Sequence, residues 1–158
     1  MKKILAILTF LLLSNSVCAS FIYVPMNHDN QRNHLKAYGI AYYAIERDVK
    51  VDWLLNYVGG SFMIKHHTQI ENECNIRGVS YNIIADAQST QILQSIASPE
   101  VNQDVVRLEK APKIAVYSPS GKQPWDDAVT MVLTYAEIPY ETIYDTEVLS
   151  DALLLYDW

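Results

Sequence analysis

The chain has 158 residues, half of them apolar, with 12 basic and 18 acidic side chains. A chain of this length forms about one domain and has enough apolar residues to build a core. Its net charge of −6 argues against nucleic acid as a partner, because nucleic-acid-binding surfaces are basic. We therefore expect one folded domain that does not bind nucleic acid.

The first nineteen residues are typical of a secretory signal peptide. Lys2 and Lys3 give a positive start, residues 4–13 are almost entirely apolar, and small residues lead to Ala19 before Ser20. The apolar run is about half the roughly 20 residues that a membrane-spanning helix needs. The pattern predicts cleavage near Ala19 and a mature chain, residues 20–158, in the periplasm or outside the cell. An uncleaved anchor and a lipid attached to Cys18 are the weaker alternatives.

Loss of the leader takes the net charge to about −8 and leaves Cys74 as the one cysteine. No internal disulfide can form, so packing must stabilise the domain. Cys74 follows Ile70 by four residues in a helical pattern, which favours a small core residue over an intermolecular bridge or a reactive thiol. No later segment is long and apolar enough to span a bilayer, so we expect no transmembrane span in the mature chain.

The first half of the mature chain alternates strand-like and helical patterns. Apolar residues from Leu35 to Val49 recur at helical spacing, Gly59-Gly60 permits a sharp turn, and Gly78 suits a left-handed helix cap. In chain order, the patterns predict a strand at 21–24, a helix at 31–48, a strand at 51–57, a helix at 66–77, a strand at 79–85, and a helix capped by Asp86 and closed by Pro99.

The second half begins with a polar, irregular stretch at 100–112, which we interpret as an excursion within the domain rather than a linker between two lobes. A strand at 113–117, a loop, a helix at 124–137 and a strand at 140–144 follow. The alternation predicts the α/β class, with three layers and a mostly parallel, Rossmann-like sheet. Because residues 153–158 are apolar and lack a closing element, we expect an incomplete N-terminal fragment of a longer protein.

In such a sheet, ligands bind outside the carboxyl ends of the strands, where loops and helix starts expose backbone N–H groups. Two loops fit this position, although neither has phosphate-loop spacing and each could be an ordinary turn. The candidate ligand-facing residues are Gly59, Gly60, Ser61, Ser118, Ser120, Gly121 and Lys122.

Motifs for metal binding and nucleophilic catalysis are missing. The four histidines do not form a His-x-x-x-His pair, and no Cys-x-x-Cys occurs. No Gly-x-Ser-x-Gly elbow is present, and Cys74 has no glycines placed to form the equivalent turn. We expect no metal site and no cofactor, and the sequence identifies no catalytic residue.

Three segments carry a family resemblance, and they cover residues 34–42, 51–62 and 124–129. The chain resembles exported bacterial proteins labelled asparagine synthetase B, along the whole mature chain. The resemblance implies glutamine-dependent, ATP-driven amidation of aspartate and a chain that continues past Trp158. The synthetases themselves use a cysteine directly after the initiator methionine and a Ser-Gly-Gly-x-Asp-Ser loop, whereas this chain has Lys2 and the order Gly59-Gly60-Ser61.

The alternating pattern is also similar to the Rossmann-like layer of class I glutamine amidotransferase-like and flavodoxin-like domains. From these observations we expect an exported domain that binds a ligand, or associates with the cell envelope, without synthetase activity. One alternative is an amidotransferase-like hydrolase whose nucleophile lies beyond residue 158. Another is an assembly module of the envelope, which would expose an apolar surface patch.

Overall fold

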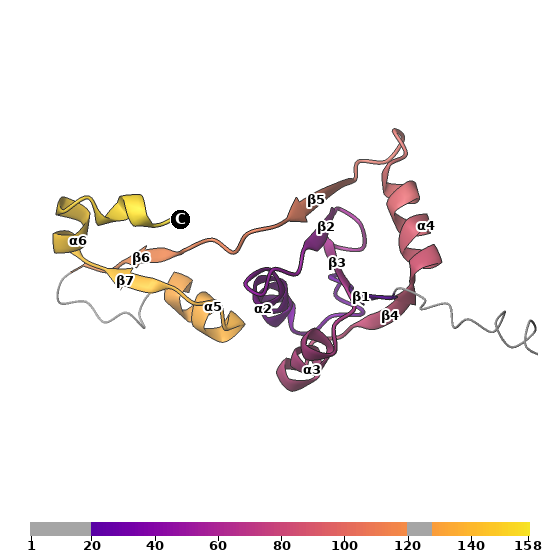
Figure 1. Cartoon of the computed structure of the whole chain (residues 1–158), viewed down its shortest axis with the longest axis horizontal. Helices are drawn as coiled ribbons and strands as arrows, with labels where there is room; N and C mark the ends of the chain where they lie inside the picture. The colour runs from indigo at the N-terminus through magenta and orange to yellow at the C-terminus, as the bar shows by residue number, and fades with distance from the viewer. Residues whose placement is uncertain (1–19, 120–127) are drawn as a thin grey trace, which may run out of the picture.

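The computed structural model describes residues 20–119 and 128–158 (Figure 1). The predicted leader, its predicted cleavage at Ala19, the start of the helix predicted at 124–137 and the candidates Ser120, Gly121 and Lys122 lie outside these residues.

The N-terminal body contains a five-stranded sheet in the order β4-β1-β3-β2-β5. All four strand pairings are antiparallel. The strands are β1 (Ser20–Val24), β2 (Val51–Leu55), β3 (Ser61–Lys65), β4 (Asn82–Ala85) and β5 (Asp104–Leu108).

Three helices cover this sheet on both faces (Figure 1). They are α2 (His34–Ile45), α3 (Thr68–Arg77) and α4 (Asp86–Ile96). One core cluster joins Ile22 and Phe62 of the sheet to Ile40 of α2 and Ile70 of α3. A second cluster lies on the opposite face and includes Ile96 of α4.

The order of strands and helices forms two interlocked split β-α-β units. Helix α2 connects β1 to β2 with β3 between them, and α3 connects β3 to β4 with β1 between them. This β-α-β-β-α-β arrangement is the ferredoxin-like topology, to which β5 adds an edge strand. A carboxylate holds that edge strand, because Asp52 is buried and accepts two hydrogen bonds from Arg107 at 2.8 and 3.2 Å.

Residues 112–119 and 128–158 form a second body, here called the C-terminal unit. It contains β6 (Ala115–Tyr117), α5 (Ala128–Ala136), β7 (Glu141–Ile143), α6 (Asp145–Leu149) and the 3-10 helix η2 (Ala152–Leu155). Strands β6 and β7 pair in parallel. On the other edge of β6, the Trp158 N–H donates to the Lys113 carbonyl at 3.2 Å, and its carbonyl accepts from the Ala115 N–H at 2.8 Å. This pattern is also that of a parallel pair.

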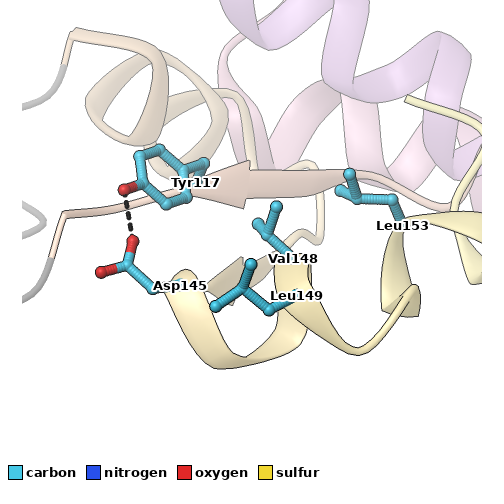
Figure 2. A pocket seen from close by; sticks show the side chains of 5 residues that line it. All are labelled: Tyr117, Asp145, Val148, Leu149 and Leu153. Carbon is cyan, nitrogen blue, oxygen red and sulfur yellow. Dashed lines mark hydrogen bonds between the residues drawn. The ribbon is translucent and has the colours of Figure 1, made fainter.

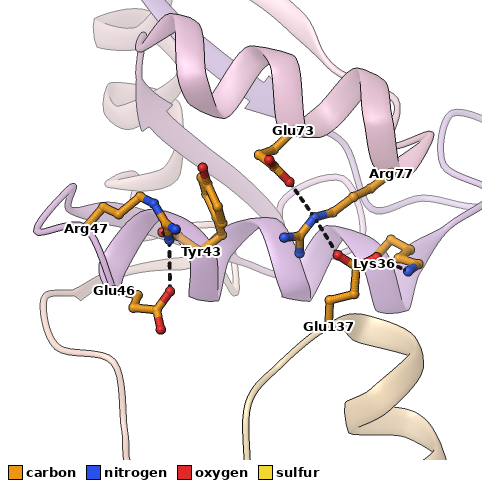
Figure 3. A network of polar contacts seen from close by, with 7 residues as sticks. All are labelled: Lys36, Tyr43, Glu46, Arg47, Glu73, Arg77 and Glu137. Carbon is orange, nitrogen blue, oxygen red and sulfur yellow. Dashed lines mark hydrogen bonds and ion pairs between the residues drawn. The ribbon is translucent and has the colours of Figure 1, made fainter.

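Helix α5 docks the C-terminal unit on α2 of the N-terminal body. The helices approach so closely at Gly39 that a Cβ there would overlap the Ala136 carbonyl oxygen. Figure 3 shows the charged contacts beside this approach, where Glu137 pairs with Lys36 at 2.5 Å and with Arg77 at 3.2 Å. Arg77 also pairs with Glu73 at 2.9 Å and is 8% exposed at its side chain. Three elements therefore meet at one charged cluster.

The predicted mostly parallel, Rossmann-like sheet is wrong, because the five-stranded sheet is antiparallel. Continuous apolar runs such as β3, with four buried residues in five, indicate a strand covered on both faces. They do not give the strand direction. The direction follows from a missed strand, since β3 begins directly after the turn that ends β2 and must return antiparallel to it.

Other local expectations are confirmed or corrected in detail. Gly78 ends α3 with a left-handed φ of 65°, as its position predicts. The stretch at 100–112 is not wholly irregular, because it contains β5. Of residues 153–158, which were expected to lack a closing element, residues 153–155 belong to a 3-10 helix. The predicted strand, helix and returning strand are present in the C-terminal unit, and its two strands pair in parallel.

Candidate ligand-binding site

The carboxyl ends of β6 and β7 bring polar groups from two strands together. Tyr117 is the last residue of β6, and Asp145 begins α6 two residues after β7 ends. The Ser118 N–H donates to the Ile143 carbonyl at 2.9 Å, which extends the pairing to this edge. Because the two strands are parallel, both carboxyl ends lie on the same side.

The Tyr117 hydroxyl donates a hydrogen bond of 2.6 Å to Oδ1 of Asp145 (Figure 2). A length below about 2.7 Å is typical of a charge-assisted O–H···O⁻ bond. This bond, followed by desolvation, raises the pKa of the Tyr117 hydroxyl, because loss of its proton would place two negative charges together. The hydroxyl therefore keeps its proton at neutral pH.

Beside this pair lies a hollow of about 520 Å³ (Figure 2). It is lined by Tyr117, Asp145, Val148, Leu149 and Leu153. We call it the carboxyl-edge hollow. Its volume lies within the roughly 300–1,000 Å³ of small-molecule sites, and its combination of apolar wall and few polar groups is typical of them.

The apolar wall comes from the short elements that follow β7. Val148 and Leu149 lie in the last turn of α6, and Leu153 belongs to η2. Leu149 is 85% exposed, so water covers most of its side chain in this structure. A ligand with an apolar part would remove that surface from water, which favours binding by about 25 cal/mol for each Å² buried.

Of the predicted ligand-facing residues, Ser118 lies nearest to the hollow in the chain, directly after Tyr117. Ser118 is buried, with 5% of its surface exposed. The other described candidates lie in the N-terminal body, in the hairpin turn between β2 and β3. Among the described candidates, Ser118 and the residues of this turn therefore belong to different bodies and do not form one site.

Backbone hydrogen bonds hold that hairpin turn, although Gly59 itself is exposed. Gly59 and Gly60 have φ of 81° and 88°, and a Cβ on Gly59 would lie 2.6 Å from the Met26 carbonyl carbon. Ser61 is completely buried, and its hydroxyl is within 3.0 Å of the carbonyl oxygens of Tyr57 and Val58. These contacts give all three residues a structural role at the turn.

The sequence interpretation missed the residues that line the hollow. Asp145 had one usable signal, a carboxylate directly after the predicted strand at 140–144. Leu149 and Leu153 had no such signal, because α6 and η2 are too short to show a helical repeat.

Within residues 20–119 and 128–158, no three potential metal-ligand side chains lie together. No helix in the described ranges is long and apolar enough to cross a membrane.

Comparison with known proteins gives no relative from which to transfer a function. No protein-family model, curated protein sequence or solved structure shows significant similarity to this chain.

Proposed function

We propose that this protein is an exported ligand-binding protein that takes a small amphiphilic molecule in the carboxyl-edge hollow, without synthetase activity. The observation that carries the proposal is the juxtaposition of a carboxylate with an apolar wall at the carboxyl ends of two parallel strands. The resemblance to exported proteins labelled asparagine synthetase B supports the export and does not supply the synthetase residues.

The chemistry of the lining defines the ligand class. Oδ1 of Asp145 accepts the Tyr117 hydroxyl, and an ionised carboxylate has further lone pairs that can accept from a ligand. Val148, Leu149 and Leu153 offer only apolar surface. The ligand should therefore pair a hydrogen-bond donor, best a cationic amine, with an apolar group of one ring or a short chain. The net charge, which is −6 for the whole chain and about −8 without residues 1–19, also favours a cation.

Phenethylamine and 3-phenylpropionate test this class, because they share a phenyl ring and differ in the sign of their charge. Calorimetric titration of the mature protein should detect phenethylamine binding and weaker or no binding of 3-phenylpropionate. Asp145→Asn should weaken phenethylamine binding by roughly tenfold, since one charge-assisted contact is lost. Equal binding of both probes, or an unchanged affinity in Asp145→Asn, would overturn the proposal.

The proposed export and the proposed absence of synthetase activity are tested separately. Mass spectrometry of the protein recovered from outside the cytoplasm should give a chain that begins at Ser20. A chain that retains residues 1–19 would contradict the cleavage. Incubation with aspartate, glutamine and ATP should form no asparagine, and asparagine above the level of a protein-free control would contradict the absence of synthetase activity.

A further inference from the structure

A second cavity lies where the C-terminal unit meets the N-terminal body. Its volume is about 240 Å³. It is lined by Tyr38, Ala41, Tyr42, Ile45, Trp53, Phe62, Leu108, Pro112, Ile114 and Ile138. We call it the junction cavity. It shares no lining residue with the carboxyl-edge hollow.

Four aromatic side chains contribute to its wall. Trp53 and Phe62 are cross-strand partners in β2 and β3, with ring centroids 6.2 Å apart. The Tyr38 ring meets Phe62 edge-on at 5.3 Å. Tyr42 follows Tyr38 by one helical turn and so lies on the same side of α2. Aromatic rings prefer such edge-to-face and tilted contacts, and further rings can join them in the same geometry.

Polar atoms on two of these side chains already have partners. The Tyr42 hydroxyl donates to the Pro112 carbonyl at 2.9 Å, and the Trp53 indole N–H donates to the Gly60 carbonyl at 3.1 Å. The other lining side chains are hydrocarbon, apart from the half-exposed Tyr38. The cavity is open to solvent, and its wall gives water few hydrogen-bonding partners. An apolar occupant is favoured because it removes this apolar surface from water.

We propose that the junction cavity binds a small, neutral, planar aromatic ligand of one or two rings. Size supports this class, because an apolar cavity of about 150 Å³ holds benzene and the junction cavity is larger. Shape and chemistry support it too, since the wall combines four aromatic rings with flat aliphatic surface. None of its ten lining residues is charged, so a charged ligand would lose its hydration without an ionic partner.

The position of the cavity gives such a ligand a structural effect. Its wall combines α2, β2 and β3 of the N-terminal body with Pro112, Ile114 and Ile138 of the C-terminal unit. A ligand that contacts both bodies binds their docked arrangement more tightly than any arrangement in which they separate. It must therefore stabilise the docked arrangement by mass action.

Indole is the probe for this site. In ¹⁵N-NMR titrations of the mature protein, indole should shift the Trp53 side-chain signal and the backbone signals around Ala41 and Ile138. Ala41→Phe fills the cavity from α2, and Ile138→Phe fills it from the other body. Each should weaken indole binding by at least tenfold, while phenethylamine binding at the carboxyl-edge hollow stays unchanged.

Three results would overturn the inference. The first is no shift at these residues up to the solubility limit of indole. The second is unchanged indole affinity in Ile138→Phe, which replaces a partly exposed residue and so tests the site even where Ala41→Phe fails to fold. The third is tighter binding of benzyltrimethylammonium than of indole, because four aromatic rings would then serve as a cage for a cation. Loss of phenethylamine binding alone would contradict the proposed function and leave this inference standing.

Discussion

The thiol of Cys74 lies completely buried in the core cluster shared by the sheet, α2 and α3. Burial, with a smaller effect from the nearby Glu71 carboxylate, raises the pKa of this thiol to about 12. Because the thiolate is the reactive form, the native protein without residues 1–19 should not react with Ellman's reagent at pH 8 within the time that the unfolded protein reacts fully. Rapid reaction of the native protein would contradict the burial of Cys74 and would indicate a reactive thiol.

The two glycines of the β2–β3 turn offer a matched pair of variants. Both have positive φ, so alanine is strained at either position. Only Gly59 has backbone within 2.6 Å of the added Cβ, whereas Gly60 has the Trp53 indole nitrogen at 3.4 Å. In urea denaturation, Gly59→Ala should lower the free energy of unfolding by about 2 kcal/mol or more, and Gly60→Ala by about 1 kcal/mol. Equal losses would contradict the packing of the turn against Met26.

Among the elements, α5 depends on one carboxylate for its charged contacts with α2 and α3. The hydrogen bond from Lys36, and then the charge of Arg77, lower the pKa of Glu137 below its usual 4.5. A group whose pKa is lowered on folding stabilises the folded state fully above its usual pKa and loses this effect as the pH falls through the lowered value. The docking of α5 should therefore weaken below about pH 4.5.

Glu137→Gln tests this dependence at the element itself. The protection factors of the α5 amides should be lower in this variant at pH 7, and between pH 6 and pH 3 they should change less than those of the wild type. Glu46→Gln is the control, because Glu46 pairs only with the exposed neighbouring Arg47. Unchanged protection in Glu137→Gln, or an equal effect of Glu46→Gln, would show that the ion pairs of Glu137 do not dock the helix.

The elements also show what sequence patterns can and cannot predict here. Helices α2 and α3 followed from apolar spacing and from Gly78, and β6-α5-β7 followed from the strand, loop and helix signals around residues 113–144. Strand β3 was missed because the Gly59-Gly60 turn was interpreted as a loop that leads into a helix. Strand β5 was missed because its stability depends on a distant partner, Asp52, which pairs with Arg107 across the sheet. No local pattern reports such a contact.

The two bodies of the molecule differ in how well burial and strand pairing protect their backbone amides from solvent. The N-terminal body has five paired strands and two buried core clusters. The C-terminal unit has a sheet of two strands, and many of its apolar side chains are exposed, among them Met131, Leu154 and Trp158. A two-stranded sheet contributes little stability of its own.

Native-state hydrogen exchange should therefore show faster exchange for β6 and β7 than for β1 and β3. The expected order follows from the lower free energy of opening of the less-buried body. Saturation with indole should slow exchange in β6, because a ligand in the junction cavity stabilises the docked arrangement. Uniform protection across both bodies in the free protein would contradict the division of the molecule into bodies of unequal stability.

Methyl NMR during a phenethylamine titration tests whether the carboxyl-edge hollow binds a ligand. Leu149 and Leu154 are a matched pair, 85% and 87% exposed, and only Leu149 lines the hollow. The Leu149 and Leu153 methyl signals should shift and the Leu154 signals should not. Consistent with this, Leu149→Ala should weaken binding severalfold, and Leu154→Ala should leave it unchanged. Shifts at Leu154 equal to those at Leu149, or no shift at either residue, would contradict a ligand site in this hollow.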